Sequence, residues 1–169
     1  MKSKFIKYNK KETLGHIISK TFPCCIKDFN QIIFDEDDNI DTIPSFFSNV
    51  LVIDLDCVEK NKAKIEKRIQ CKTMDTTFAI SNTSSIEMLL VELRFNYRNL
   101  SNLDRNELLG KVSGSINLLG NSVVINNNYI FIFQPNLIQQ AINRLQRMNP
   151  RIPNNYIAMD LNQLISVYF

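Results

Sequence analysis

Long apolar runs are missing from this sequence, and so are the compact motifs of several common sites. No stretch approaches the roughly 18 consecutive apolar residues of a membrane-spanning helix. Lys20 and His16 interrupt the apolar run that follows the Lys-rich N-terminus, so we expect no secretory signal. His16 is the single histidine, and with no partner motif around it we expect a surface or boundary position instead of a catalytic role.

Cysteine and glycine are scarce, and their spacing argues against several classes of site. The four cysteines, at positions 24, 25, 57 and 71, include no Cys-x-x-Cys pair, so neither a zinc site nor a disulfide framework is indicated. We therefore expect reduced thiols and a cytoplasmic protein. No Gly-Lys-Ser/Thr phosphate loop is present. The acidic run at 35–38 lacks the spacing and the glycine of a calcium loop and is predicted to be an exposed loop.

The sequence also has no large excess of positive or negative charge. The net charge of +3 permits binding to a nucleic acid without demanding it. The chain is 44% apolar and 22% charged, as is usual for a globular protein, and its 169 residues suffice to bury about 70% of the unfolded surface. With no internal repeat and no long linker, we expect one domain over residues 1–169.

The order of the apolar patterns predicts an α/β fold, with a mixed central sheet flanked by helices. We divide the chain into a helical or irregular N-terminal extension (1–49), a core (50–135) and a C-terminal helix and strand (136–169). Gly110 and Gly114 share one face of a predicted helix and would allow it to approach a sheet closely. The predicted helices cover residues 12–22, 58–70, 104–119 and 137–148, and the predicted strands cover 31–34, 50–56, 72–81, 86–97, 123–125, 129–133, 156–159 and 164–169.

Residues 72–97 are the most informative stretch, because two β-rich segments flank the polar turn Asn82-Thr-Ser-Ser85 and predict a hairpin. If Ser81 pairs with Ile86, Asp75 faces Glu92, and directly opposed side chains have Cβ atoms about 4.5–5.5 Å apart. Arg94 lies on the same face as Glu92, since alternate residues of a strand share a face. Two neighbouring carboxylates repel each other, and a bound Mg²⁺ or Mn²⁺ ion or a raised pKa relieves that repulsion.

The predicted helix 58–70 and the residues after it are rich in basic side chains. This pattern indicates either a solvated helix face or a surface that binds nucleic-acid phosphates. The candidate nucleic-acid-binding residues are Lys60, Lys64, Lys67, Arg68 and Lys72.

Asp75, the triplet Glu92-Leu93-Arg94, the helix at 104–119 and the strand at 129–133 together resemble the core of the PD-(D/E)xK, or restriction-endonuclease-like, superfamily. The resemblance covers residues 50–135 and implies an αβββαβ core and a Mg²⁺-dependent nuclease acting on DNA or RNA. It implies Asp75 and Glu92 as metal ligands, with Arg94 at the family's Lys position. It also implies that Glu59 or Glu66, from the preceding helix, supplies a further catalytic acid.

Two positions depart from the family pattern. Arg94 replaces the Lys, and arginine stays protonated, so it can stabilise charge but cannot take a proton from water. Met74 stands where the family has Pro. In the alternative interpretation, Asp75 is a strand-end acid and Glu92 is an ion-pair partner of Arg94 or Arg98.

Two rival functions come from other classes. The segment 50–58, with Asp54 and Asp56, is similar to the first motif of the haloacid dehalogenase superfamily, which implies a phosphatase with Asp54 as nucleophile and Asp56 as general acid/base. The segment Phe78–Ser81 would then imitate its second motif. The other rival is a non-catalytic interaction protein with a protein partner: an inhibitor, an immunity factor or a defence-complex subunit on a degenerate nuclease fold. The weak net charge and Arg94 favour it.

Overall fold

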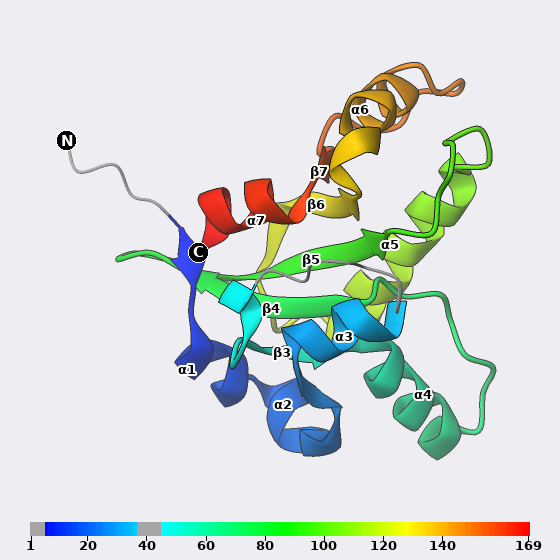
Figure 1. The fold of residues 1–169 in the computed structure, drawn as a ribbon. Coiled ribbons are helices and arrows are strands. Elements are labelled where there is room, and N and C mark those ends of the chain that lie inside the picture. Colours follow the sequence, from blue (N-terminus) through cyan, green and yellow to red (C-terminus); the bar gives the residue numbers. More distant parts are fainter. Residues whose placement is uncertain (1–5, 37–44) are drawn as a thin grey trace.

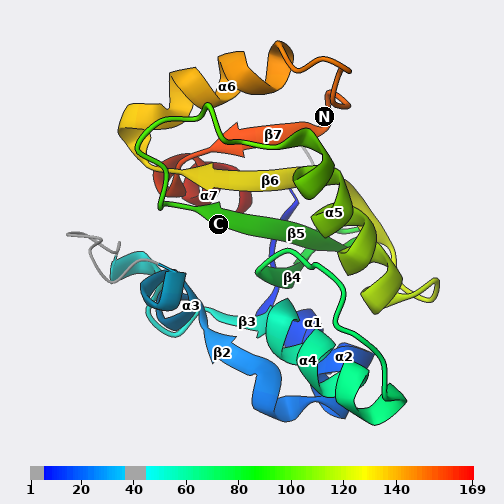
Figure 2. The ribbon, with the colours of Figure 1, turned by 90° about the vertical axis from the view of Figure 1, so that its right-hand side faces the viewer.

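A computed structural model describes residues 6–36 and 45–169, and it contains one seven-stranded mixed sheet. Six strands follow the order β2-β3-β4-β5-β6-β7, stacked from bottom to top in Figure 2, and β1 pairs with β4. The pairs from β2 to β5 are antiparallel, whereas β5, β6 and β7 are parallel. The strands are β1 (Lys7–Tyr8), β2 (Ile26–Asp28), β3 (Leu51–Asp54), β4 (Thr76–Ser81), β5 (Ile86–Arg94), β6 (Ile125–Phe133) and β7 (Tyr156–Met159).

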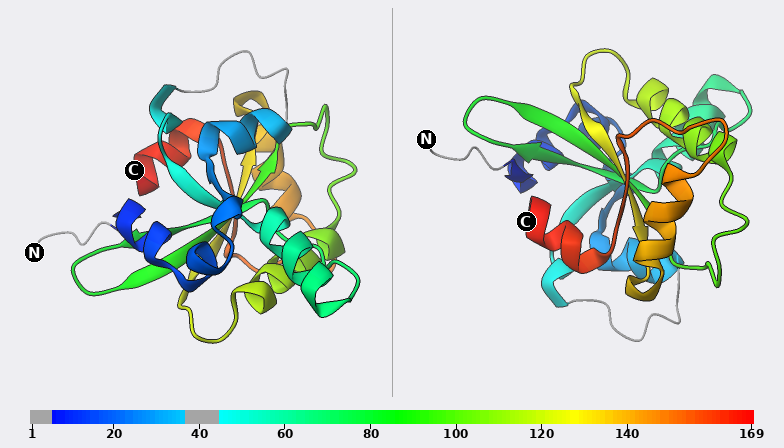
Figure 3. Two further views of the ribbon diagram at one scale, coloured as in Figure 1. Left: turned by 90° about the horizontal axis from the view of Figure 1, so that it is seen from below. Right: turned by 90° about the horizontal axis from the view of Figure 1, so that it is seen from above.

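Helices cover both faces of this sheet (Figure 1). Both views in Figure 3 place α3 and α7 together on one side and α4 and α5 together on the other. None of the helices in the described parts of the chain is both long and apolar enough to cross a bilayer. The helices are α1 (Lys10–Gly15), α2 (Ile17–Thr21), α3 (Phe29–Glu36), α4 (Leu55–Glu66), α5 (Arg105–Leu119), α6 (Ile138–Gln146) and α7 (Leu161–Tyr168), with 3-10 turns at Pro23–Cys25, Ser45–Phe47 and Pro135–Leu137.

Strand β5 divides the interior into two apolar cores, because its side chains alternate between the faces. Met88 and Leu90 belong to the core under α4, α5 and α6, whereas Leu89 and Val91 belong to the core under α3 and α7. The same alternation turns Glu92 toward α5. The acidic position predicted from the sequence therefore faces a helix, not open solvent.

The hairpin register is the predicted one, with Ser81 opposite Ile86 and Thr76 opposite Val91. The turn is closed by Asn82, whose side-chain Oδ1 accepts hydrogen bonds from the backbone N–H groups of residues 84 and 85. The register places the residue before β4 opposite Glu92, as the sequence predicts.

Several element predictions are corrected. Residues 31–34 lie in α3 and residues 164–168 in α7, so both predicted strands are helical. The Asp28 carboxylate accepts from the Asn30 N–H at the start of α3, and Asp160 forms a capping box with Gln163 at the start of α7. The predicted helix 12–22 is two helices, because His16 leaves the helical conformation and caps α2 through Nδ1. Residues 125–133 form one strand.

The α/β class is confirmed, with two differences in organisation. Strands β1 and β2 belong to the sheet, so residues 1–49 are not merely an extension of it. Helix α4 lies between β3 and the hairpin, where the sequence predicts a helix at 58–70, so the three strands of the αβββαβ core that the resemblance implies are not consecutive. Of the acidic run at 35–38, Asp35 and Glu36 end α3, and residues 37 and 38 lie outside the described residues.

The cysteines also differ from the prediction of reduced thiols. Cys25 and Cys57, 32 residues apart in sequence, form a disulfide that joins the 3-10 turn before β2 to the first turn of α4. Cys24 and Cys71 are free and exposed. Spacing along the chain cannot reveal this pairing, because β2 and β3 bring the two segments together only in the fold.

Candidate functional site

The predicted pair of acids meets at the end of the hairpin, on the face covered by α5. Asp75 immediately precedes β4, and its Oδ2 accepts a hydrogen bond of 2.6 Å from the Leu93 N–H. Glu92 lies beside Leu93 on β5. Both acids are buried, with 5% of Asp75 and 1% of Glu92 exposed.

Lys111 of α5 joins the two carboxylates. Its Nζ is 2.7 Å from Glu92 Oε1 and 3.8 Å from Asp75 Oδ1, so a single ammonium contacts both acids. Lys111 is not among the residues predicted from the sequence. A signal for it was present: Lys111 lies three residues after Leu108 and four before Ser115, on the buried face of α5. A lysine within an apolar stripe needs buried partners, and carboxylates on the facing strand supply them.

Arg94 makes the contacts that the alternative interpretation predicts. Its Nε lies 3.0 Å from Glu92 Oε1, and its Nη2 lies 2.9 Å from Glu107 Oε1 on α5. The Tyr97 ring and hydroxyl also contact the guanidinium. Arg94 is therefore held between β5 and α5 by carboxylates on both elements.

Burial dominates the electrostatics of the two acids. Loss of hydration raises the pKa of Asp75 well above its usual range, and the nearby Glu92 carboxylate raises it further. Loss of hydration also raises the pKa of Glu92, while Lys111 and Arg94 oppose this. Burial works to lower the pKa of Lys111, but the Glu92 and Asp75 carboxylates outweigh it and raise that pKa. Lys111 therefore carries a positive charge at neutral pH.

One carboxylate oxygen of the pair is available to bind a hard divalent cation. Among the described residues, Glu92 Oε2 is a buried carboxylate oxygen with no hydrogen-bond partner. Such an oxygen normally has a partner, and Mg²⁺ or Mn²⁺ prefers carboxylate oxygens as ligands. Asp75 and Glu92 are the residues that would hold the ion, as the sequence predicts.

The positive charge of Lys111 also opposes the raised pKa of two further acids, Asp56 and Glu36. The pKa of Asp56, in the first turn of α4, is raised by lost hydration, while the Thr73 hydroxyl and then Lys111 lower it. The pKa of Glu36, at the end of α3, is likewise raised by lost hydration and lowered by Lys111. Lys111 therefore acts electrostatically on an acid of α3 and an acid of α4, as well as on the two acids that it contacts.

Glu59 and Glu66 are not brought to Asp75 and Glu92. Both bind Arg68: Glu59 Oε1 and Glu66 Oε2 each lie 2.5 Å from a guanidinium nitrogen. Glu59 Oε1 also accepts a hydrogen bond from the Cys71 N–H. The acid of α4 whose pKa Lys111 affects is instead Asp56, one helical turn before Glu59.

The predicted basic residues are exposed on α4 and the segment after it. Lys60, Lys64, Lys67 and Lys72 are exposed, whereas the Arg68 guanidinium is occupied by the two glutamates. The backbone of this segment packs tightly on α5: a Cβ at Gly114 would lie 1.9 Å from the Lys72 carbonyl oxygen. The close approach predicted from the two glycines therefore occurs at one of them, and against a loop, not a strand.

Ser115 anchors the backbone immediately before Asp75. Its Oγ accepts a hydrogen bond of 2.8 Å from the Met74 N–H and donates one to the Lys111 carbonyl oxygen. The backbone next to Asp75 is thus fastened to the helical turn that carries Lys111. This link fixes the position of the ammonium relative to the hairpin.

In the segment that resembles the phosphatase motif, the Asp54 carboxylate makes structural contacts. Asp54 Oδ1 accepts from the Cys57 N–H as the N-cap of α4, and its Oδ2 pairs with Lys27 at 2.6 Å. Both oxygens of the proposed nucleophile are therefore engaged. Residues 78–81 lie within β4 and are mostly buried.

Comparison of the chain with protein-family models, with curated proteins and with solved structures finds no match. The functional interpretation therefore depends on the geometry of Asp75, Glu92, Arg94 and Lys111.

Proposed function

We propose that the protein is a Mg²⁺- or Mn²⁺-dependent nuclease of the PD-(D/E)xK type, in which Lys111 of α5 takes the place of the motif lysine. The observation that carries the proposal is the contact of one ammonium with both Asp75 and Glu92, at 3.8 and 2.7 Å. It supplies the lysine that the hairpin itself lacks. Because its pKa is raised, Lys111 would supply a fixed positive charge, as Arg94 does, and would not act as a base.

Each side chain has a separate task in this proposal. Asp75 and Glu92 would hold the cation, which lowers the pKa of a coordinated water and stabilises charge on the phosphate when bound. Lys111, protonated and fixed by Ser115, would bind a phosphate oxygen and orient the attacking water. Arg94, held by Glu107, would stabilise negative charge that develops on the phosphate.

The substrate in this proposal is DNA or RNA, and the protein acts in the cytoplasm. The exposed lysines at 60, 64, 67 and 72 would contact the phosphate backbone. Because such contacts release counterions, binding through them weakens as salt concentration rises.

The test is cleavage of labelled DNA and RNA, single- and double-stranded, with Mg²⁺, Mn²⁺ or a chelator. We expect metal-dependent cleavage that Asp75→Asn, Glu92→Gln and Lys111→Met each abolish. Lys20→Met removes an exposed ammonium from α2 by the same chemical change and should leave cleavage intact. Mn²⁺ binding, followed by electron paramagnetic resonance, should be lost in the two acid variants. Cleavage that persists in Glu92→Gln would refute the proposal.

A second candidate, a non-catalytic interaction protein, is favoured by one specific observation. Lys111 and Arg94 neutralise the two acids within the protein, and almost none of either carboxylate is exposed. An ion cluster of this kind can serve the fold alone. In that case the folded wild-type protein binds no Mn²⁺, cleaves no nucleic acid and is recovered from its host in a stable complex with another protein.

A further inference from the structure

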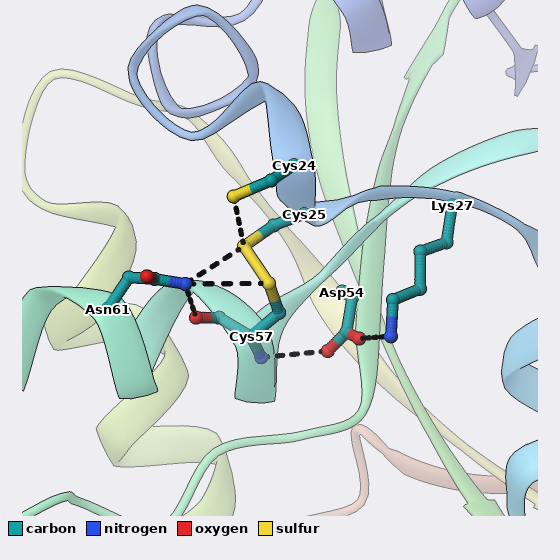
Figure 4. Close-up of a disulfide and its surroundings, with 6 residues drawn as sticks. All are labelled: Cys24, Cys25, Lys27, Asp54, Cys57 and Asn61. Atoms are coloured by element: carbon teal, nitrogen blue, oxygen red, sulfur yellow. Dashed lines mark hydrogen bonds and ion pairs between the residues drawn. A yellow bond between two sulfur atoms is a disulfide. The ribbon is translucent and has the colours of Figure 1, made fainter.

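Three cysteine sulfurs gather at the start of α4, away from the contacts of Asp75 and Glu92. Cys24 and Cys25 end the 3-10 turn before β2, and Cys57 lies in the first turn of α4 (Figure 4). The three sulfur atoms all lie within 4.8 Å of one another. Cys25 and Cys57 are joined as a disulfide, and Cys24 Sγ is 3.9 Å from Cys25 Sγ.

The surroundings of these sulfurs favour negative charge on them once the disulfide is reduced. Asn61 Nδ2 points at both bonded sulfurs, 3.6 Å from Cys25 Sγ and 3.6 Å from Cys57 Sγ (Figure 4). Cys57 also lies at the positive end of a 12-residue helix, where thiolates are stabilised. A donor side chain and a helix N-terminus therefore converge on one sulfur cluster.

The spacing of the sulfurs matches that of ligands around one metal ion. Sulfur ligands at about 2.3 Å from tetrahedral Zn²⁺ lie about 3.8 Å from each other. Cys24 and Cys25 already have this separation, at 3.9 Å. Breaking the Cys25–Cys57 bond removes the covalent constraint that holds the third sulfur too close to its neighbour.

We propose that the reduced protein binds one thiophilic divalent cation, with Zn²⁺ as its representative, through the thiolates of Cys24, Cys25 and Cys57. The disulfide form excludes the ion, because two of the three ligands are then bonded to each other. Cys57 also lines an open cavity of about 700 Å³, from which water can complete the coordination. Three soft sulfur ligands distinguish this site from the oxygen ligands at Asp75 and Glu92.

Conversion between the two forms requires a reductant, which we identify as a dithiol of the thioredoxin class. The dithiol transfers two electrons and two protons to the Cys25–Cys57 bond and becomes a disulfide itself. Cys25 and Cys57 are then thiols, and each thiol that binds the cation releases its proton to solvent. Cys25 is buried, so the reductant reaches the disulfide at Cys57, which is partly exposed and lines the open cavity.

The test uses the full chain, reduced with a phosphine and titrated with Co²⁺, whose thiolate complexes absorb strongly in the near ultraviolet. We expect one equivalent to bind, and Zn²⁺ to displace it. Cys24→Ser should weaken Co²⁺ binding by about 100-fold or more while keeping the disulfide-forming pair, so its fold can be checked in the oxidised state. Cys71→Ser removes the other free thiol and should bind as the wild type does.

Three further results bear on the proposal. The oxidised wild-type protein should bind no Co²⁺, and Zn²⁺ should raise the Tm of the reduced wild type but not of reduced Cys24→Ser. Asp75→Asn should bind Co²⁺ normally, so failure of the nuclease proposal leaves this one standing. Wild-type affinity in Cys24→Ser, loss of binding in Cys71→Ser or no binding by the reduced wild type would each overturn it.

Discussion

Replacing Lys111 with methionine is the most direct perturbation of the charged cluster. The side chain keeps its length and apolar stem but loses the ammonium that contacts Glu92 and Asp75. Both carboxylates then remain buried, and Arg94 stays as a counter-charge for Glu92. Because the positive charge no longer opposes the loss of hydration, the pKa values of both acids rise further above their ordinary values.

The size of the effect follows from the burial of the pair. Removing one partner of a buried ion pair costs about 3–5 kcal/mol. The Lys111 side chain is 18% exposed and the Glu92 side chain is 2% exposed. Partial solvation of the ammonium lowers the expected loss of unfolding free energy to about 2–3 kcal/mol at neutral pH. Combining Lys111→Met with Glu92→Gln removes the uncompensated charge, and the two changes should couple by about 2 kcal/mol.

The sign of the pH dependence provides an independent check. An acid whose pKa is raised by folding costs stability once pH rises above its unfolded pKa, and the full cost is present above its folded pKa. The destabilisation by Lys111→Met should therefore be small near about pH 4 and reach its full size by about pH 8.

Urea denaturation at both pH values measures this, with Lys20→Met as the exposed control. A loss below about 0.5 kcal/mol at the higher pH, or a loss independent of pH, would refute the assignment of Lys111 as the counter-charge.

Four more substitutions test the same region by urea denaturation. Asp75→Asn keeps an acceptor for the Leu93 N–H and removes an acid whose pKa is raised. It should therefore increase the unfolding free energy by ~1 kcal/mol at about pH 8 and have no such effect near pH 4. Destabilisation at the higher pH would contradict this. Gly110→Ala should stabilise α5 by about 0.5–1 kcal/mol, because no atom lies within 4 Å of the new Cβ. Gly114→Ala should destabilise the protein by more than ~1 kcal/mol, because its Cβ meets a backbone oxygen. Equal effects of the two substitutions would be inconsistent with the close packing. Ser115→Ala leaves the buried Met74 N–H without its acceptor and should cost about 1–3 kcal/mol, and a neutral result would show that this bond does not hold the segment.

The hairpin could be predicted because local signals agree on it. A four-residue polar turn and two strands with apolar faces leave one register that buries both faces, and that register is present. The predicted helix at 104–119 is also present as α5, with Asp104 as its N-cap and Gly120 as its C-cap. In each case the deciding residues lie within a few positions of the element that they define.

Two predicted strands are helices because short apolar runs have no diagnostic period. At 161–168 the deciding signal is the Asp160 capping box with Gln163, a spacing visible in the sequence but outweighed in the prediction by β-branched and aromatic residues. At 29–36 the helix start depends on the Asp28 carboxylate, which also accepts from the Asn49 N–H. That contact links segments 21 residues apart, so pattern alone could not show it.

Lys111 escaped prediction for a different reason. Its partners are set by how α5 docks on β5, and this depends on the close approach at Gly114 and the Ser115 hydrogen bond. The Cys25–Cys57 pair likewise depends on which strands are neighbours. The apolar stripe of α5 could have drawn attention to Lys111, but the partners of such residues become visible only when the helix and the sheet are placed together.

The placement of charge explains why this cluster is the best candidate for function. Glu92 stands between Val91 and Leu93 on a central strand, where an apolar residue would cost the fold less. The protein compensates with Lys111 and Arg94 and still leaves Glu92 Oε2 without a hydrogen-bond partner among the described residues. This buried carboxylate, with its raised pKa and its unpartnered oxygen, is the feature on which we base the proposal of a cation site.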